Sequence, residues 1–421
     1  MNERLLVGLD IGTTKVTAVI GERAADGVLD IIGEGTVPSE GIRRGAVVNL
    51  EKAAEAIQRA LQAAQRVAGI EVRETFVAVG GTQIRSHTSN GLAAIRRGLT
   101  IKPEDVERAI EQARAYPLEA DRELLHVIPL EFRVDGQEGI HDPVGMTGVR
   151  LEVDVLLVST ASGPLANLKR AVETAGLNIR GLVASPYASG LGVLLPEERE
   201  MNTVVLDLGA GTTGVAYFKE GRLAYAEVLP LGGELISSDI SKLLKISFEE
   251  AERIKKKYGA ALPELADPEL VLEINQAGYT AAGVPAPELA RIIRPRVREI
   301  FLLARKSLEN AIGPLEVNAS KLVLTGGSAL LPGTDELARR DFGLPVRLGR
   351  PTGVDGLADL VSSPAYAAAV GLIHYGEGHV LNHHVGQGFK LPPQLKVKKS
   401  HSKPRGKNIW EQIKAFFKDF F

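Results

Sequence analysis

The sequence of 421 residues predicts an α/β protein made of two related domains, with a subdomain inserted in the first domain and an amphipathic helix at the C-terminus. Three observations lead to this prediction. A strand–turn–strand motif at residues 8–20 recurs at 205–217, which indicates an internal duplication. Residues 82–160 follow a pattern of their own, and the last 14 residues carry large apolar side chains at helical spacing.

The first domain begins with apolar runs between residues 4 and 37, which predict strands joined by tight turns. Residues 50–68 predict an amphipathic helix, with Asn49 as its N-cap and Gly69 as its stop. The strand TFVAV follows at 75–79. Strands and a long helix in this order are typical of an α/β domain.

The inserted block, residues 82–160, has a helix near 103–115 that precedes two long strands. The strands are HVIPLEFRVDG at 126–136 and VRLEVDVLLVST at 149–160, and the second partly alternates apolar and polar residues. We therefore expect a small subdomain with its own sheet.

The α/β pattern resumes after residue 160 with a helix at 162–175 and three strands between 203 and 229. A long helix is predicted over 286–311, bent at Pro295. The strand KLVLT then leads through a glycine-rich loop into a helix at 334–343. This second series completes the predicted pair of related domains.

The repeated motif carries the predicted chemistry. GLDIGTTKVTAVI and VLDLGAGTTGVAY each place an Asp at the end of an apolar strand, ahead of a turn rich in Gly and Thr. Glycines let backbone N–H groups approach oxyanions, and Thr hydroxyls add donors, so the turns predict phosphate binding. Asp10 and Asp207 could hold a hydrated Mg²⁺. The phosphate-binding residues are predicted to be Gly12, Thr13, Thr14, Lys15, Gly209, Gly211, Thr212 and Thr213.

One such turn alone would indicate no more than a β-hairpin, but two matching copies favour a phosphate clamp. Two further segments fit a nucleotide. In LTGGSALLPG, Gly326, Gly327 and Ser328 could lie flat against a base or ribose, although strand-to-helix turns of this kind are common. Glu252 and Lys255 share one helix face and could flank the ribose and purine, or could be an ordinary surface pair.

The tail predicts a reversible membrane anchor. Residues 390–407 carry seven Lys or Arg and no acid, which favours an anionic surface. Nucleic acid is a less favoured partner, because the aromatic residues gather on one helix face instead of alternating with the bases. The alternative is a terminal helix that docks on protein. The proposed apolar face consists of Ile409, Trp410, Ile413, Phe416, Phe417, Phe420 and Phe421.

Composition excludes several classes of site. The absence of cysteine excludes disulfides and thiolate chemistry. The eight histidines are scattered, and the pair His383–His384 falls in the predicted linker, so no histidine metal site or general base is indicated. The N-terminus is too quickly polar for a secretory signal, and no run reaches the ~18 apolar residues of a membrane span. We expect a cytoplasmic protein, peripheral on a membrane.

These motifs together resemble the actin, sugar kinase and heat-shock chaperone superfamily, and within it the FtsA family of bacterial cell-division proteins. GLDIGTTKV is similar to the first phosphate segment of that family, VLDLGAGTTGVA to the second, and LTGGSALLPG to the adenosine segment. HVIPLEFRVDG and DPVGMTGVRLEV resemble its specific inserted subdomain. The resemblance implies an actin-like ATPase fold in which two related domains close over ATP and Mg²⁺ in a nucleotide cleft.

The resemblance also implies a division of the chain into subdomains, which are given by residue ranges alone. We expect subdomain 1A at 1–81, 161–200 and 361–381; 1C at 82–160; 2A at 201–240 and 315–360; 2B at 241–314; a flexible basic linker at 382–407; and the membrane-targeting helix at 408–421.

The family polymerises into actin-like filaments and recruits the tubulin-like protein FtsZ to the inner face of the cell membrane at the division septum. The resemblance therefore implies self-assembly, anionic lipid, the FtsZ C-terminal peptide and other division proteins as partners. It places the FtsZ contact on the helix around 286–311, where Arg296 could meet an acidic peptide or could be an ordinary exposed arginine. We expect at most weak ATPase activity.

Three alternatives share the phosphate motifs. A small-molecule kinase would need an aspartate poised against a substrate hydroxyl, and no candidate stands out. A chaperone ATPase would need a substrate-binding β-domain for which too little chain remains. A pilus-assembly relative is disfavoured by the amphipathic tail.

Overall fold

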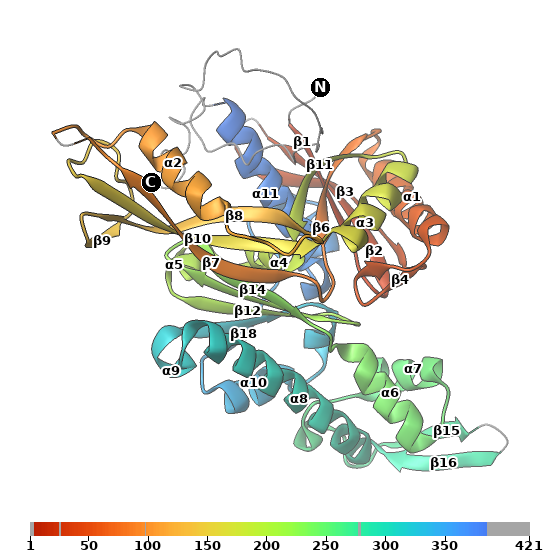
Figure 1. Cartoon of the computed structure of the whole chain (residues 1–421). Coiled ribbons are helices and arrows are strands. Elements are labelled where there is room, and N and C mark those ends of the chain that lie inside the picture. The colour runs from red at the N-terminus through yellow and green to blue at the C-terminus, as the bar shows by residue number, and fades with distance from the viewer. Residues whose placement is uncertain (1–3, 25–26, 97, 277–278, 385–421) are drawn as a thin grey trace. The chain divides into compact units, whose positions relative to one another are not determined.

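The computed structural model describes residues 4–24, 27–96, 98–276 and 279–384 (Figure 1). Its contacts divide the chain into two compact units. The larger unit contains the described residues up to Arg85 together with Ala161–His374. The smaller unit contains Ser86–Thr160 together with the described residues from Tyr375 onward.

Two sheets form the framework of the larger unit. The first has the strand order β11-β6-β1-β2-β3-β19, and the second has the order β14-β13-β12-β17-β18. The strands of the first sheet are β1 (Leu5–Ile11), β2 (Lys15–Arg23), β3 (Leu29–Pro38), β6 (Glu74–Val79), β11 (Asn178–Ala184) and β19 (Asp355–Gly356). The strands of the second are β12 (Thr203–Leu208), β13 (Thr213–Lys219), β14 (Arg222–Leu229), β17 (Lys321–Thr325) and β18 (Val346–Leu348).

The two sheets share one topology. In each, the first strand pairs antiparallel with the next strand along the chain and parallel with a strand that returns after a helix: β1 with β2 and β6, β12 with β13 and β17. The registers match as well, since Asp10 lies opposite Thr17 and Asp207 lies opposite Gly214. The prediction of two related α/β domains is therefore confirmed.

Helix α1 (Leu50–Ala68) packs on the first sheet with small residues at the contact. Asn49 accepts a hydrogen bond from Lys52 N at 3.0 Å, and Gly69 ends the helix at a φ of 69°, as expected. A Cβ added to Gly35 of β3 would lie 2.1 Å from Ala60 O. Glycine in the strand therefore allows the helix backbone to approach closely, and the buried alanines of α1 complete the contact.

Helices of the second half cover one face of the five-stranded sheet. Their shared core includes Phe301 and Phe342, whose rings meet edge to face at 5.7 Å. The helices of this core are α6 (Gly233–Leu244), α7 (Phe248–Tyr258), α8 (Ala286–Ile312), α9 (Leu315–Asn318) and α10 (Thr334–Phe342). Helix α3 (Ser162–Thr174) packs instead on α1 and β11, while α4 (Ser185–Val193) and α5 (Pro196–Glu200) contact β12 and β13. Two short hairpins, β4 (Ile42–Arg43) with β5 (Ala46–Val47) and β15 (Val271–Gln276) with β16 (Tyr279–Pro285), complete the larger unit.

The inserted block forms its own sheet and core in the smaller unit. Its strand order is β7-β10-β8-β9, and helix α2 (Pro103–Arg114) lies along this sheet (Figure 1). The apolar face of α2 packs with Phe132 of β8 and Val153 of β10. The strands are β7 (Arg85–Ala94), β8 (Arg122–Val134), β9 (Gln137–Ile140) and β10 (Arg150–Ala161).

Helix α11 (Ala367–His384) ends the described chain. It extends three residues into the predicted linker 382–407 and includes His383 and His384. The rest of the linker and the predicted anchor at 408–421 lie outside the described residues. Among the helices between residues 4 and 384, none combines the length and apolar character needed to span a bilayer.

Candidate functional site

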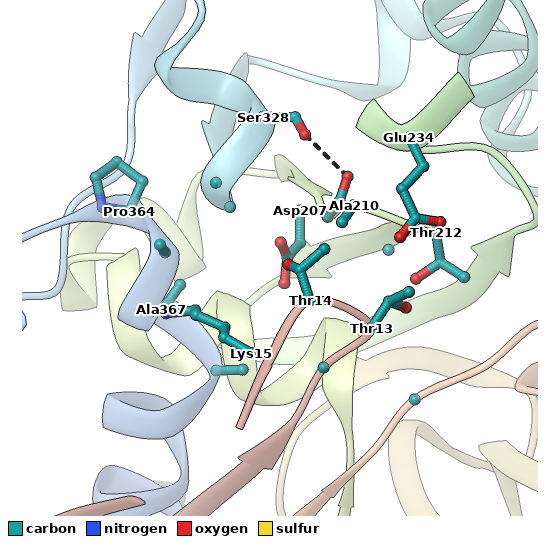
Figure 2. Close-up of a pocket in the computed structure, with 18 of the residues that line it drawn as sticks. Thr13, Thr14, Lys15, Asp207, Ala210, Thr212, Glu234, Ser328, Pro364 and Ala367 are labelled. Carbon is teal, nitrogen blue, oxygen red and sulfur yellow. Dashed lines mark hydrogen bonds between the residues drawn. The ribbon is translucent and has the colours of Figure 1, made fainter. Parts of the chain in front are cut away.

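The predicted site segments line one cavity of about 470 Å³ within the larger unit. Figure 2 shows side chains from both repeated turns, among them Thr14 and Asp207, in this cavity. Of the residues predicted from sequence, the cavity is lined by Asp10, Gly12, Thr13, Thr14, Lys15, Asp207, Gly209, Thr212, Glu252, Lys255, Gly326, Gly327 and Ser328.

The two repeated turns have the same backbone structure. Gly12 N donates to Lys15 O at 2.9 Å in the first turn, and Gly209 N donates to Thr212 O at 3.0 Å in the second. The hydrogen bond therefore spans four residues in each turn, 12–15 and 209–212, at matching positions of the two repeats. The matched loops present their backbones and hydroxyl groups to the same cavity.

Two predicted residues do not line the cavity. Gly211 lies where the loops touch, since a Cβ there would be 2.7 Å from Thr13 Oγ1. Its small size allows the two loops to meet. Thr213 is buried and donates its hydroxyl to Leu231 O at 2.8 Å, which ties β13 to the chain after β14. The sequence pattern could not distinguish this structural threonine from its neighbour Thr212.

Asp10 and Asp207 bring two carboxylates into the cavity. Burial raises the pKa of Asp10 to about 6, although nearby Lys15 opposes the rise and Asp207 adds to it. Burial also raises the pKa of Asp207, against the hydrogen bond from Ser189 Oγ and the charge of Lys15. A cation at this point would relieve both carboxylates. Two carboxylates fit a hydrated Mg²⁺ that takes its other ligands from water and phosphate, and no cluster of three acidic or histidine ligands occurs among the described residues.

Lys15 is held by groups that the sequence did not reveal. Its Nζ lies 4.2 Å from the centre of the Tyr366 ring, a cation–π contact. The Tyr366 hydroxyl donates to Glu34 Oε1 at 3.1 Å. Burial lowers the pKa of Lys15, while Asp10, Glu34 and Asp207 counteract this effect. Tyr366 therefore fixes the direction of a lysine that faces the two carboxylates.

The third predicted segment connects strand β17 to the second loop. Gly326 has a φ of 85°, and a Cβ on it would lie 2.3 Å from Asp207 Oδ1. Only glycine meets both conditions. Ser328 Oγ donates to Gly209 O at 3.0 Å, which is the dashed line in Figure 2. The glycine pair is thus required by the close approach of the two segments.

Glu252 and Lys255 form an ion pair of 2.6 Å in the cavity wall. Their side chains are 24% and 11% exposed, which rules out the ordinary solvated pair that the sequence left open. Lys255 Nζ also donates to Gly233 O at 3.0 Å, and Glu252 accepts a hydrogen bond from Ser237 Oγ. These contacts fix both groups beside the N-terminal turn of helix α6.

Several lining residues were missed. Glu234 lies in the first turn of α6. Burial and the nearby Glu252 raise its pKa. The signal was present, because LGGEL at 231–235 repeats the pattern of a glycine pair before a helix. Other lining residues that were not predicted one by one are Gly45, Gly80, Gly81, Ser185, Lys256, Leu330, Leu331, Pro332 and Ala365. Leu330, Leu331 and Pro332 belong to the predicted segment LTGGSALLPG, and Lys256 follows Lys255 in helix α7.

Arg296 is not a free cation. Its guanidinium donates from Nε to Asp239 Oδ2 at 2.7 Å and from Nη2 to Asp239 Oδ1 at 3.1 Å, and it also pairs with Glu299. An acidic peptide would have to displace these carboxylates, so the structure favours an intramolecular role for this arginine. The predicted membrane residues Ile409 to Phe421 lie outside the described residues.

Known proteins match this chain both in the α/β domains and in the inserted block. A family model described as "Cell division protein FtsA" matches residues 204–371, and one described as "SHS2 domain inserted in FTSA" matches 81–159. The chain is 38% identical to "Cell division protein FtsA" of Pseudomonas aeruginosa over 89% of each chain. It is 35% identical to the protein of the same name from Borreliella burgdorferi over 100% of each.

Solved structures with low sequence identity share the fold. The "PilM-PilN type IV pilus biogenesis complex" matches with a TM-score of 0.65 at 19% identity, covering 88% of this chain and 98% of the other. MreB5 of Spiroplasma citri bound to ADP matches with a TM-score of 0.57 at 14% identity, covering 91% and 99%. The same protein has been solved with AMPPNP. The fold is therefore actin-like, with an inserted SHS2 domain.

Proposed function

Because this chain belongs to the FtsA family of cell division proteins, we propose that it binds Mg-ATP in the cavity and polymerises as an actin-like filament on the inner face of the cytoplasmic membrane. There it tethers FtsZ, through the FtsZ C-terminal peptide, to the division septum. Other division proteins join the same assembly.

The observation that carries the nucleotide part is the pair of matched loops, each preceded by a partly buried aspartate. The loops offer backbone N–H groups and the hydroxyls of Thr13, Thr14 and Thr212 to a phosphate chain. Lys15 supplies a positive charge beside them. MreB5, which shares the fold, has been solved with ADP and with AMPPNP, which supports a nucleotide as the ligand.

Magnesium bound to the phosphates would neutralise charge between the two aspartates. Asp10 and Asp207 would hold its water ligands, since both carboxylates line the cavity and neither forms an ion pair with a cation of the described residues. The glycine segment at 326–327, with Leu331, Glu252 and Lys255, would bind the nucleoside. ATP would act chiefly as a switch that favours the closed, filament-forming arrangement, with hydrolysis slow.

The membrane part rests on the sequence of the tail. Its seven apolar side chains and basic linker give two weak membrane signals, and a filament would multiply them by avidity. The FtsZ part rests on family membership, and the outer face of helix α8 is its proposed site. Arg296 is 24% exposed and pairs with two carboxylates, whereas Arg291 is 66% exposed and its ion pair with Glu288 lies at the surface, so Arg291 is a better first candidate.

One titration tests both the anchor and the switch. Trp410 is the single tryptophan, so its emission can be followed as anionic or neutral liposomes are added to the full chain, with and without Mg-ATP. We expect a blue shift on anionic vesicles that salt weakens and Mg-ATP steepens. Emission that ignores lipid would refute the anchor, and emission already blue without lipid would indicate docking on protein. Loss of the ATP effect alone would refute the switch.

The pilus-assembly alternative is supported by likeness of fold alone, at 19% identity. No observation in the cavity favours a small-molecule kinase.

A further inference from the structure

The β4–β5 hairpin, with the sequence GIRRG at 41–45, lies against both phosphate loops. Gly45 lines the cavity, and its N–H donates to Thr13 Oγ1 at 3.3 Å. On the second loop, a Cβ added to Gly211 would lie 3.1 Å from the Cα of Arg44. The hairpin therefore meets the two loops at the place where they touch each other.

This position puts Arg44 within reach of any phosphate that the loops hold. Its Cα is in near contact with the loop at 209–212, and an extended arginine side chain is longer than that separation. Both Arg43 and Arg44 are exposed. Neither forms an ion pair with any residue in the described part of the chain, in contrast to Arg296, which two carboxylates hold.

Both arginines interact electrostatically with a residue that lines the cavity. Burial and Glu252 raise the pKa of the lining residue Glu234, and Lys255, Arg43 and Arg44 oppose that rise. The two guanidinium groups thus contribute positive potential at the cavity. A guanidinium that extends over such glycine and threonine loops can bind a phosphate in a bidentate manner.

The turn itself does not explain the arginine. Arg44 and Gly45 are the two residues between the hairpin strands, with φ values of 48° and 73°. Two-residue turns with positive φ at both positions prefer Asn-Gly or Asp-Gly, because a longer side chain is strained in the left-handed region. Gly45 is required by packing, since a Cβ there would lie 2.5 Å from Gly81 N. Arginine at position 44 therefore incurs strain that turn formation does not require.

We propose that Arg44, supported by Arg43, binds the terminal phosphate of the nucleoside triphosphate and so distinguishes ATP from ADP at this site. The proposal rests on the proposed function, because it requires a nucleotide whose phosphates lie between the two loops. The hairpin would close the phosphate end of the cavity when the third phosphate is present. Glu234 would be repelled by the same phosphate and balanced by the two arginines.

The test compares ATP and ADP affinities of the full chain with those of Arg44→Asn. Asparagine is favoured at this turn position, so the variant removes the charge without opposing the backbone. With Mg²⁺ present, we expect ATP to bind about tenfold or more weakly, the loss of one charge-assisted interaction, and ADP to bind within about threefold of the wild type. Arg44→Lys should give an intermediate ATP affinity, and Arg73→Asn, an exposed arginine elsewhere in the larger unit, should change neither.

Equal weakening of ATP and ADP by Arg44→Asn, or no weakening of either, would overturn the role of Arg44 and leave the proposed function intact. A wild-type chain that binds neither nucleotide would overturn both proposals. If circular dichroism shows that Arg44→Asn is not folded, Arg44→Lys and Arg43→Asn decide the matter through the same ATP-to-ADP ratio. An unchanged ratio in both variants would refute the proposal.

Discussion

Replacing Asp10 by asparagine should stabilise the ligand-free protein at neutral pH while removing its response to Mg-ATP. Burial raises the pKa of Asp10 from 3.8 to about 6, a value that already includes the attraction of Lys15. The difference corresponds to a destabilisation of about 3 kcal/mol when the carboxylate is ionised in both the folded and the unfolded state. Asparagine has nearly the same shape and bears no charge, so it would not incur this cost.

The sign of the pH dependence follows from the same values. Below pH ~4 the carboxyl is protonated in both states, so it contributes nothing to the difference. As the pH rises toward the folded-state pKa of about 6, the unfolded chain releases its proton first, and the folded state becomes relatively less stable. The advantage of Asp10→Asn should therefore grow across this window and reach its full size of about 3 kcal/mol above it.

Urea denaturation followed by far-ultraviolet circular dichroism at several pH values from 4.5 to 7.5 measures this difference. Glu71→Gln, which neutralises an exposed acid of the same unit, is the matched control. Mg-ATP should raise the denaturation midpoint of the wild type and of the control but not that of Asp10→Asn. A stability gain that is absent at pH 7.5, or that does not depend on pH, would show that Asp10 is not a strained buried carboxylate.

Three further predictions follow from the contacts of the larger unit. Gly326→Ala should abolish ATP binding, because the added Cβ would lie 2.3 Å from Asp207 Oδ1. Gly343 has a similar positive φ but open space around it, so Gly343→Ala should only lower the stability by ~1 kcal/mol. Tyr366→Leu should weaken ATP binding by roughly fivefold or more and leave adenosine binding unchanged, because the ring that orients Lys15 is lost; equal effects on both ligands would contradict this. Glu198→Gln should lower the free energy of unfolding by about 2–4 kcal/mol, since this buried acid pairs with two cationic side chains, and a neutral result in urea denaturation would refute it.

The duplication could be read from the sequence because it is local. Each copy is a strand, an aspartate and a short loop, and backbone rules alone turn such a segment into a hairpin. The same is true of helix α1, whose limits are set by Asn49 and Gly69. The Gly- and Thr-rich turns also followed from the pattern, and the structure gives both turns the same backbone hydrogen bond.

The roles of individual side chains were harder to predict from the sequence. Thr212 and Thr213 are identical in type and adjacent, yet one lines the cavity and the other bonds to Leu231 O. Strand pairing decides this, since Thr213 begins β13 and pairs with Leu208 and Leu229, whereas Thr212 still belongs to the loop. Arg296 likewise could not be separated from a free surface arginine until Asp239 of another helix was placed beside it.

The sequence by itself determined the two related domains, the inserted block, the phosphate loops and the aspartates that precede them, because these depend on residues close together in the chain. Only the tertiary structure decided that Tyr366 and Glu34 orient Lys15, that Gly326 must clear Asp207, and that the β4–β5 hairpin meets both loops. Such contacts join segments separated by tens to hundreds of residues, and their energies depend on distances of a few ångströms. No local pattern records those distances, so packing alone sets them.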